Sequence, residues 1–443
     1  MRSRGRSSMK NDNQQAIDAT AQTMLADARH YVESVAAMAE TAELSAAQDI
    51  VSSTGIKLIA RGARIDASLR EKLRGHRLSG MSLEKSLAVA GGVTPETLAI
   101  NMSRLIEEDA WFKSLAARSG DPGAMRHGAA RLDLPREILF RLTVAREQRP
   151  ALYLHSIRVA VICHYLGLRL PLRAAGIDNL VIAALCHDLG ELFIDPAILD
   201  TEHRIAEEER RYIDVHPIVS WLMVCDLPGM PAEAASAILQ HQERLDGSGY
   251  PYGRKEDALG LPGRMLAAAD LAASIVARFK NRHRLSTLLR LNRNRYDAKA
   301  TNLLHEATRH DAPESGHLEH EAVMKRLSGF VAILDGWGQL RAAREIGPNI
   351  LGDFLPTRMF NLRSLVVQFG FDPYNLATPL QLAAEDPAIA AELNAVLDEL
   401  QFQLADLGRE FDRRTATLMT TLDPLAASAL TDWRRQLQEC IGA

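Results

Sequence analysis

Aromatic residues and cysteines are scarce in this sequence, and basic residues do not outnumber acidic ones. Aromatics make up 5% of the 443 residues, so a stacking platform for single-stranded nucleic acid is not expected. Lys and Arg number 52 against 56 Asp and Glu, and the resulting charge of -4 argues against a coat for nucleic acid phosphates. One small anion in a local pocket stays compatible with this balance. No apolar run reaches the roughly 20 residues that a membrane span needs.

The scarce cysteines and the polar start of the chain bear on its compartment. The chain has four cysteines and no CxxC pair, which favours a reduced, cytoplasmic protein. Residues 1–15 mix basic and small polar side chains, and no apolar segment follows them. That pattern excludes a signal peptide and predicts a disordered tail over 1–15.

Hydrophobic periodicity predicts a mainly α-helical chain with a small α+β N-terminal module and a helical C-terminal extension. A helical pattern runs from residue 16 to about residue 47. Alternating apolar and polar residues, bracketed by glycine, then predict a small hairpin over 50–62. Clusters of turn residues at 119–123 and 310–316 suggest boundaries. The expected modules are 16–122, 136–310 and 318–443.

The C-terminal extension carries one long amphipathic pattern. Asp386 and Pro387 predict a helix start, with an N-cap acid followed by proline at the first helical position. An apolar stripe then runs from Ile389 to Phe411. Packing within the same chain is the favoured interpretation, and pairing of subunits into a homodimer is the alternative.

Histidines and acids in apolar surroundings are the best candidates for chemistry. Asp270 is the only acid in the apolar stretch 265–276, and a buried carboxylate without a partner costs several kcal/mol. Taken singly, each such histidine is more often a core or capping residue than a ligand. Taken together, buried imidazoles and carboxylates suit one or two divalent metals, because the cation compensates the buried anions. The set is His155, His187, Asp188, His216, His241 and Asp270.

A carboxylate such as Asp188 can bridge two ions, and such a pair stabilises in-line attack on phosphorus. The dipeptide His187-Asp188 alone is not specific. The order His, His-Asp, His-Pro, His, Gly-Tyr-Pro, Asp is far more specific.

On these motifs, the segment from about residue 150 to 308 resembles the HD-GYP domain, a bacterial subgroup of the HD metal-dependent phosphohydrolases. The resemblance rests on 154–159, 185–190, 215–217, 241–251 and 264–270, in family order. It implies an HD-type helical bundle, divalent ions that are commonly iron or manganese, and hydrolysis of cyclic di-GMP to linear pGpG or GMP.

Carried over residue by residue, the resemblance implies two metal positions. His155, His187, Asp188 and Asp270 would hold one ion, and His216 and His241, with Asp188 bridging, would hold the other. The implied catalytic residues are Asp188 and Arg244. The implied substrate-binding residues are Glu191, Arg244, Gly249, Tyr250 and Pro251.

Three positions depart from the family pattern. Gln242 replaces a second histidine, and an amide oxygen is a poorer ligand than imidazole for a transition metal. Glu191 replaces a lysine that would face the substrate phosphates, which reverses the local charge. Ala151 stands where some members have a further acid, so a third ion is not expected.

Three functional hypotheses follow. The first is a metal-dependent phosphodiesterase acting on cyclic di-GMP. The second is a catalytically degenerate regulatory module that binds nucleotide or a signalling partner, since Gln242 and Glu191 both weaken the site. The third is an HD phosphohydrolase of another nucleotide. A GGDEF-type signalling partner is also expected from the resemblance.

Overall fold

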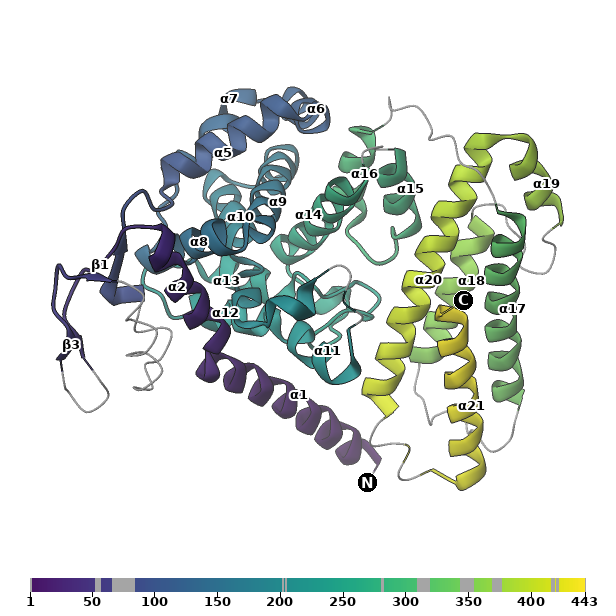
Figure 1. Cartoon of the computed structure of the whole chain (residues 1–443). Coiled ribbons are helices and arrows are strands. Elements are labelled where there is room, and N and C mark those ends of the chain that lie inside the picture. Colours follow the sequence, from purple (N-terminus) through teal and green to yellow (C-terminus); the bar gives the residue numbers. More distant parts are fainter. Residues whose placement is uncertain are drawn as a thin grey trace. The chain divides into compact units, whose positions relative to one another are not determined.

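Helices dominate the computed structural model (Figure 1). The structure describes residues 2–51, 57–65, 84–200, 203, 205–279, 283–308, 319–342, 354–368, 377–415, 419 and 422–442. The predicted fold class, mainly α with a small N-terminal sheet, is confirmed.

Two helices open the chain, α1 (Arg2–Asp27) and α2 (Arg29–Thr41). The segment expected to be a disordered tail, 1–15, overlaps α1, which begins at Arg2. This polar segment contains no proline, which would interrupt a helix. Polar side chains do not by themselves prevent one. The single helix predicted from residue 16 to 47 is broken at Ala28, whose φ of 45° lies in the left-handed region that alanine rarely adopts.

Short strands follow the first two helices. In one sheet, β1 (Leu44–Ala46) lies between β4 (Arg64–Ile65) and β5 (Leu87–Val89), and both pairings are antiparallel. In the other, β2 (Ile50–Val51) pairs antiparallel with β3 (Lys57–Ile59). The hairpin predicted over 50–62 is therefore confirmed, with residues 52–56 outside the described part of the chain.

The next helices build the core in which the candidate site lies. Capping residues explain several of the helix starts: Thr94 accepts from the Thr97 amide, and Asp109 accepts from the amides of Trp111 and Phe112. The helices are α5 (Pro95–Glu108), α6 (Ala110–Arg118), α7 (Pro122–His127), α8 (Arg136–Gln148), α9 (Pro150–Arg169), α10 (Ala174–Cys186), α11 (Glu207–Asp214), α12 (His216–Val224), α13 (Ala232–Gln240) and α14 (Leu261–Arg278). Short 3-10 helices η1 (Gly128–Arg131), η2 (Leu189–Phe193), η3 (Pro196–Leu199) and η4 (Glu256–Ala258) connect some of them.

Helix α9 forms the centre of this core and packs along α10. Among the described residues it is the one helix long and apolar enough, by length and composition, to cross a membrane. In that stretch, 67% of the residues are buried inside the protein. The central helix of a packed helical domain is also long, apolar and mostly buried.

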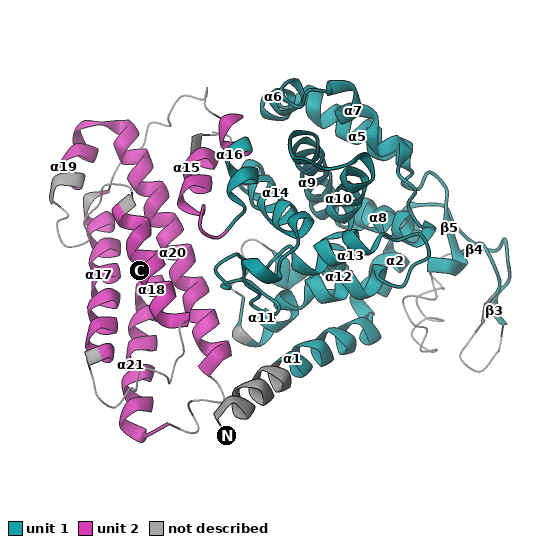
Figure 2. Cartoon of the chain, turned by 180° about the vertical axis from the view of Figure 1, so that it is seen from behind, with its two compact units in different colours: residues 1–277, 296–303 teal, residues 278–295, 304–443 magenta. Residues whose placement is uncertain are grey.

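The chain divides into two compact units, shown in different colours in Figure 2. Unit 1 comprises residues 1–277 and 296–303, and unit 2 comprises residues 278–295 and 304–443. The module expected at 16–122 therefore does not stand alone, since it belongs to the same unit as the central helices. The boundary expected near 310 lies outside the described residues.

Unit 2 is a bundle of helices. They are α15 (His283–Leu291), α17 (His320–Ala342), α18 (Phe354–Gln368), α19 (Ala377–Glu385), α20 (Pro387–Thr415) and α21 (Pro424–Ile441), while α16 (Ala298–Glu306) spans the change of unit. The predicted start of α20 is confirmed, because the Asp386 carboxylate accepts from the Ala388 amide at 2.7 Å. The predicted stripe is buried from Leu393 to Phe411 against helices of the same unit, as the favoured interpretation required.

His164, on α9, is a buried histidine away from the candidate site, with 1% of its surface exposed. Neither of its ring nitrogens has a hydrogen-bond partner within the described part of the chain. A Cβ atom added at Gly128 would lie 2.2 Å from the ring carbon Cε1, so the ring is tightly enclosed. Burial, helped by the charge of Arg131, lowers the pKa of His164 to about 4.

This histidine should therefore destabilise the fold in acid. The unfolded chain takes up a proton near pH 6.5 while the folded chain resists protonation until about pH 4, so stability falls as the pH drops through that window. Between pH 8 and pH 5 we expect wild-type protein to lose about 2 kcal/mol more than His164→Leu. Urea unfolding at the two pH values measures the difference, with the exposed His127→Leu as control. Equal losses in all three proteins would contradict the prediction.

Candidate metal centre

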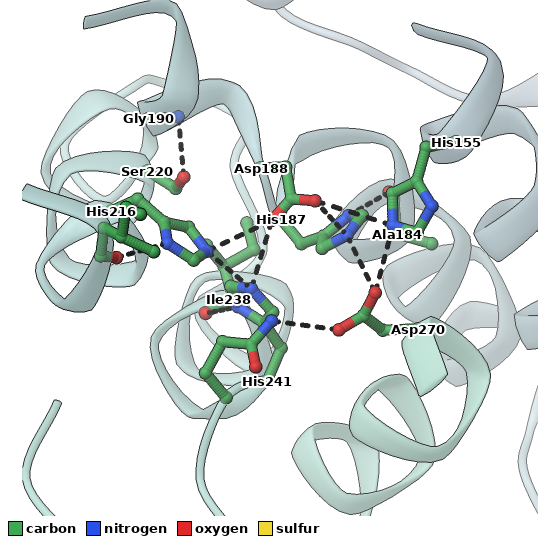
Figure 3. Close-up of polar contacts among 12 residues, drawn as sticks. His155, Ala184, His187, Asp188, Gly190, His216, Ser220, Ile238, His241 and Asp270 are labelled. Carbon is green, nitrogen blue, oxygen red and sulfur yellow. Dashed lines mark hydrogen bonds and ion pairs between the residues drawn. The ribbon is translucent and has the colours of Figure 1, made fainter. Parts of the chain in front are cut away.

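The histidines and acids singled out in the sequence converge on one place in unit 1. His155 comes from α9, His187 caps the C-terminal end of α10 and is followed by Asp188, and His216 opens α12. His241 caps the C-terminal end of α13, and Asp270 lies in the middle of α14. Their side chains point toward one another (Figure 3). We call these six residues the His/Asp cluster.

One half of the cluster surrounds one oxygen of Asp188. His187 Nε2 lies 2.9 Å and His155 Nε2 lies 3.5 Å from Asp188 Oδ2. His155 Nε2 also lies 3.0 Å from Asp270 Oδ1. The ligand atoms of His155, His187, Asp188 and Asp270 all fall within 4.8 Å of one another, a spacing suited to a metal ion.

The other half surrounds the second oxygen of the same carboxylate. His216 Nε2 and His241 Nε2 each lie 3.2 Å from Asp188 Oδ1, and 3.1 Å from each other. These three residues form a second group with metal-ligand spacing. Asp188 is therefore shared, with one oxygen facing each pair of imidazoles.

Backbone contacts fix the tautomers of three of these rings. The Nδ1 atoms of His187, His216 and His241 lie 2.8, 2.6 and 2.6 Å from the carbonyl oxygens of Ala184, Ile213 and Ile238. A carbonyl only accepts, so each Nδ1 carries the proton and each neutral ring presents a bare Nε2 lone pair to the cluster. This arrangement is the usual outer support of a metal-binding histidine.

The chemistry of these donors fits a divalent cation. With both Nδ1 atoms protonated, the Nε2 lone pairs of His216 and His241 face each other and a carboxylate oxygen at little more than 3 Å. Such acceptors repel one another unless a proton or a cation lies between them. Asp188 Oδ1 and His187 Nε2 are also fully buried without a hydrogen-bond partner within the described ranges. A metal ion would satisfy all of these atoms at once.

The pKa values of His187, Asp270 and His241 also indicate that positive charge stabilises the cluster. Burial opposes a charge on His187, but the neighbouring carboxylates of Asp188 and Asp270 outweigh it and raise the pKa of His187 to about 9. Burial also opposes ionisation of Asp270, yet its hydrogen bond with His155 holds its pKa at about 2. Burial lowers the pKa of His241 to about 4. The cluster thus keeps two carboxylates ionised and needs cations beside them.

Gly190 allows the segment after Asp188 to pack closely against the start of α12, which carries His216. Its amide donates to Ser220 Oγ at 2.8 Å, which ties η2 to the first turns of α12. A Cβ atom at this position would lie 2.4 Å from the His216 carbonyl oxygen. Only glycine therefore allows the residues after Asp188 to approach His216 this closely.

The loop after His241 is held by an acid that the sequence reading missed. Glu243 is 2% exposed, and its carboxylate accepts from the amides of Tyr252 and Arg254 at 2.9 and 2.8 Å. Gly249 packs against the same turn, since a Cβ atom there would lie 2.4 Å from the Gln242 carbonyl oxygen. The buried position of Glu243 could not be distinguished in sequence from that of a solvated acid in a polar loop.

The predicted substrate residues lie around the cluster. The centroids of the Tyr250 and His216 rings are 6.1 Å apart, with Gly249 and Pro251 beside Tyr250 in the chain. Glu191 is half-buried on η2, and burial together with the Asp188 charge raises its pKa to about 7. Arg244 lies over the Tyr296 ring at 4.7 Å.

Two contacts of the N-terminal helices were also not visible in the sequence. The Tyr252 hydroxyl donates to Asp18 of α1 at 2.7 Å, and the Tyr31 ring of α2 stacks on Phe193 of η2 at 4.9 Å. Phe193 lies in the segment that follows Asp188, and Tyr252 lies in the loop that follows His241. The helices α1 and α2 therefore support both segments from outside.

Comparison with known proteins is consistent with this geometry. A family model described as an HD domain matches residues 102–300. Residues 102–300 form an HD domain. It contains the whole His/Asp cluster, so the family resemblance found in the sequence is confirmed at the level of the HD domain.

Relatives of the HD domain include several bacterial phosphodiesterases. The cyclic di-GMP phosphodiesterase PA4108 of Pseudomonas aeruginosa is 29% identical over 125 residues, 28% of this chain and 30% of the relative. The 3'3'-cGAMP-specific phosphodiesterase 3 of Vibrio cholerae is 34% identical over 123 residues, 28% of this chain and 26% of the relative. The cyclic di-GMP phosphodiesterase response regulator RpfG of Xanthomonas campestris is 30% identical over 146 residues, 32% and 38% of the two chains. The chain thus spans only about a quarter to two fifths of the length of these relatives.

Proposed function

We propose that this protein is a metal-dependent phosphodiesterase of the HD-GYP type that hydrolyses cyclic di-GMP to linear pGpG or GMP. One observation carries the proposal: the two oxygens of the buried Asp188 face two separate pairs of imidazoles. That arrangement suits two divalent ions that share a carboxylate. The relatives named above act on cyclic dinucleotides, which supports this substrate class.

The donor set indicates which residues would hold the ions. His155, His187, Asp188 and Asp270 would hold one, and Asp188, His216 and His241 the other. Imidazole with carboxylate suits iron or manganese among the common divalent ions. When bound, such ions polarise a phosphoryl oxygen and make water a nucleophile near neutral pH.

The chain itself supplies orientation and a dry environment. The carbonyls of Ala184, Ile213 and Ile238 hold three imidazoles with Nε2 directed inward. Burial of the cluster excludes bulk water, which strengthens every electrostatic interaction with a phosphodiester. Hydrolysis adds one water across a P–O bond and opens the ring to a linear dinucleotide.

Arg244 and the segment Gly249-Tyr250-Pro251 would border the dinucleotide. The Arg244 guanidinium directs donors to the carbonyls of His241 and Glu243 and to Gln242 Oε1. A guanidinium has five N–H groups, so donors are left for a phosphate oxygen as negative charge develops there. Glu191, with its raised pKa, would face the same region and weaken anion binding when ionised.

The decisive experiment is an assay with a panel of metals. Purified protein loaded with Mn²⁺ or Fe²⁺ is expected to linearise cyclic di-GMP, and His187→Ala should reduce the rate at least about 1,000-fold because the Nε2 ligand is lost. The exposed His127→Ala is the matched control and should keep the wild-type rate. Product analysis by chromatography distinguishes pGpG from GMP, with 3'3'-cGAMP as a parallel substrate.

Two other outcomes would replace the proposal. Nucleotide binding without turnover, for every metal tested, would support a regulatory module. Turnover of other nucleotides but of neither cyclic dinucleotide would support a general HD phosphohydrolase. A GGDEF-type signalling partner, a homodimer and a cytoplasmic location stay predictions from the sequence.

A further inference from the structure

Gln242 stands where the family pattern has a histidine, and both ends of its side-chain amide form hydrogen bonds. Its Nε2 donates to Asp270 Oδ2 at 3.0 Å, and its Oε1 accepts from Arg244 Nη2 at 2.9 Å. The opposite amide orientation would place two donors together at Arg244 and two acceptors together at Asp270. The partners therefore determine which end of the amide faces each of them.

This orientation directs the amide oxygen away from a ligand role. Oε1 faces the Arg244 guanidinium, whose positive charge opposes a metal ion at the same oxygen. Nε2 carries its hydrogens and has no free lone pair to coordinate. These contacts therefore argue against Gln242 as a weak metal ligand.

The bond to Asp270 has a direct consequence for the cluster. With Oδ2 occupied by Gln242, Asp270 presents Oδ1 to the cluster, 3.0 Å from His155 Nε2 and 3.9 Å from His187 Nε2. This hydrogen bond favours an orientation in which Oδ1 alone faces an ion, because turning Oδ2 toward the same ion would pull it away from Gln242. Outer hydrogen bonds of this kind orient metal ligands.

The main chain of Gln242 is equally constrained. Its carbonyl oxygen accepts from the Tyr250 amide at 3.1 Å, and Gly249 packs against it with no space for a Cβ atom. The residue therefore joins α14, through Asp270, to the loop that carries Tyr250.

We propose that Gln242 is a positioning residue that holds Asp270 in a single-oxygen orientation toward the first ion, and is not itself a ligand. The inference rests on the proposed metal site. It assigns to this glutamine the task of an outer hydrogen-bond donor at a position where a histidine would coordinate directly.

A double-mutant cycle tests this role, with Mn²⁺ affinity measured by the EPR signal of the free ion. Gln242→Met keeps the size of the side chain and removes both hydrogen bonds. In the wild-type background it should weaken Mn²⁺ binding by about 10–100-fold, the usual cost of losing an outer partner. In the Asp270→Ala background it should cost no more than about twofold, because the carboxylate it positions is gone.

The outcomes separate this inference from the proposed function. If wild-type protein binds no Mn²⁺, the metal site itself is wrong. If wild-type protein binds Mn²⁺ but Gln242→Met costs the same in both backgrounds, Gln242 is a direct ligand and the positioning role is overturned. No loss in the wild-type background overturns it as well. Gln148→Met, at the end of α8, is the matched control and should bind as wild type.

A spectroscopic readout excludes a merely structural effect. In Gln242→Met the freed Oδ2 of Asp270 can join the coordination of the ion, so the visible absorption of bound Co²⁺ should change in shape and intensity. A general loss of stability would lower the melting temperature and leave the spectrum of the loaded protein as in wild type. An unchanged Co²⁺ spectrum alongside reduced affinity would therefore contradict the proposal.

Discussion

Replacing Asp188 with alanine should lower Mn²⁺ affinity at both ion positions by more than about 100-fold, beyond the usual cost of losing an outer partner. The carboxylate provides one oxygen to the His155 and His187 pair and the other to the His216 and His241 pair. No other residue of the cluster belongs to both groups. Elemental analysis after gel filtration should find less than one ion per chain in this variant.

Variants of single histidines should behave differently. His155→Ala removes a donor from the first group alone and His216→Ala removes one from the second, so each should retain one ion of two. Asp226→Asn, an exposed acid in the loop after α12, is the control for loss of negative charge. A wild-type stoichiometry in Asp188→Ala, or equal losses in all three cluster variants, would show that the carboxylate is not shared.

Much of the fold could be predicted because its signals are local. The hairpin over 50–62 follows from alternation between glycines, and the start of α20 follows from Asp386 and Pro387. The break at Ala28 had no such signal, because alanine is the strongest helix former and is held here in a conformation it disfavours. Helix α1 begins at Arg2, within a polar stretch for which the sequence predicted a disordered tail.

The cluster could be predicted because its residues are chemically unusual for their surroundings. A histidine or acid within an apolar helix needs a partner, and the order of the motifs indicated which residues would meet. Its outer support could not be predicted. Gln242 and Asp270 are 28 positions apart, and nothing in the sequence gives the direction of an amide. Glu243 looked like any polar loop residue until its contacts with two backbone amides were known.

The ion pair of Arg141 and Glu84 was missed for the same reason, since 57 positions separate the partners. Arg141, on α8, donates from Nε and Nη2 to the two carboxylate oxygens of Glu84 at 2.7 and 2.5 Å. Its Nη1 donates to the Met223 carbonyl at 2.6 Å. Both charged side chains are 1% exposed. The pair joins the segment before β5 to α8 and, through the Met223 carbonyl, to α12, which carries His216 of the His/Asp cluster.

Arg141→Met should therefore destabilise the protein by about 3–5 kcal/mol, the usual cost of leaving one member of a buried ion pair without its partner. The Glu84 carboxylate would remain in a site where burial already raises its pKa against the influence of Arg141. The Met223 carbonyl would also lose its donor. Urea unfolding followed by circular dichroism measures the change in the free energy of unfolding.

An exposed arginine–carboxylate pair that uses the same two guanidinium nitrogens provides the control. Arg131 also donates from Nε and Nη2 to both oxygens of a carboxylate, that of Asp178, but the two side chains are 50% and 30% exposed. Arg131→Met should cost less than about 1 kcal/mol, because water solvates the carboxylate left behind. The double variant Glu84→Leu/Arg141→Met should be more stable than Arg141→Met, since no charge is left buried. Equal costs for Arg141→Met and Arg131→Met would mean that burial does not determine the strength of the Glu84 pair.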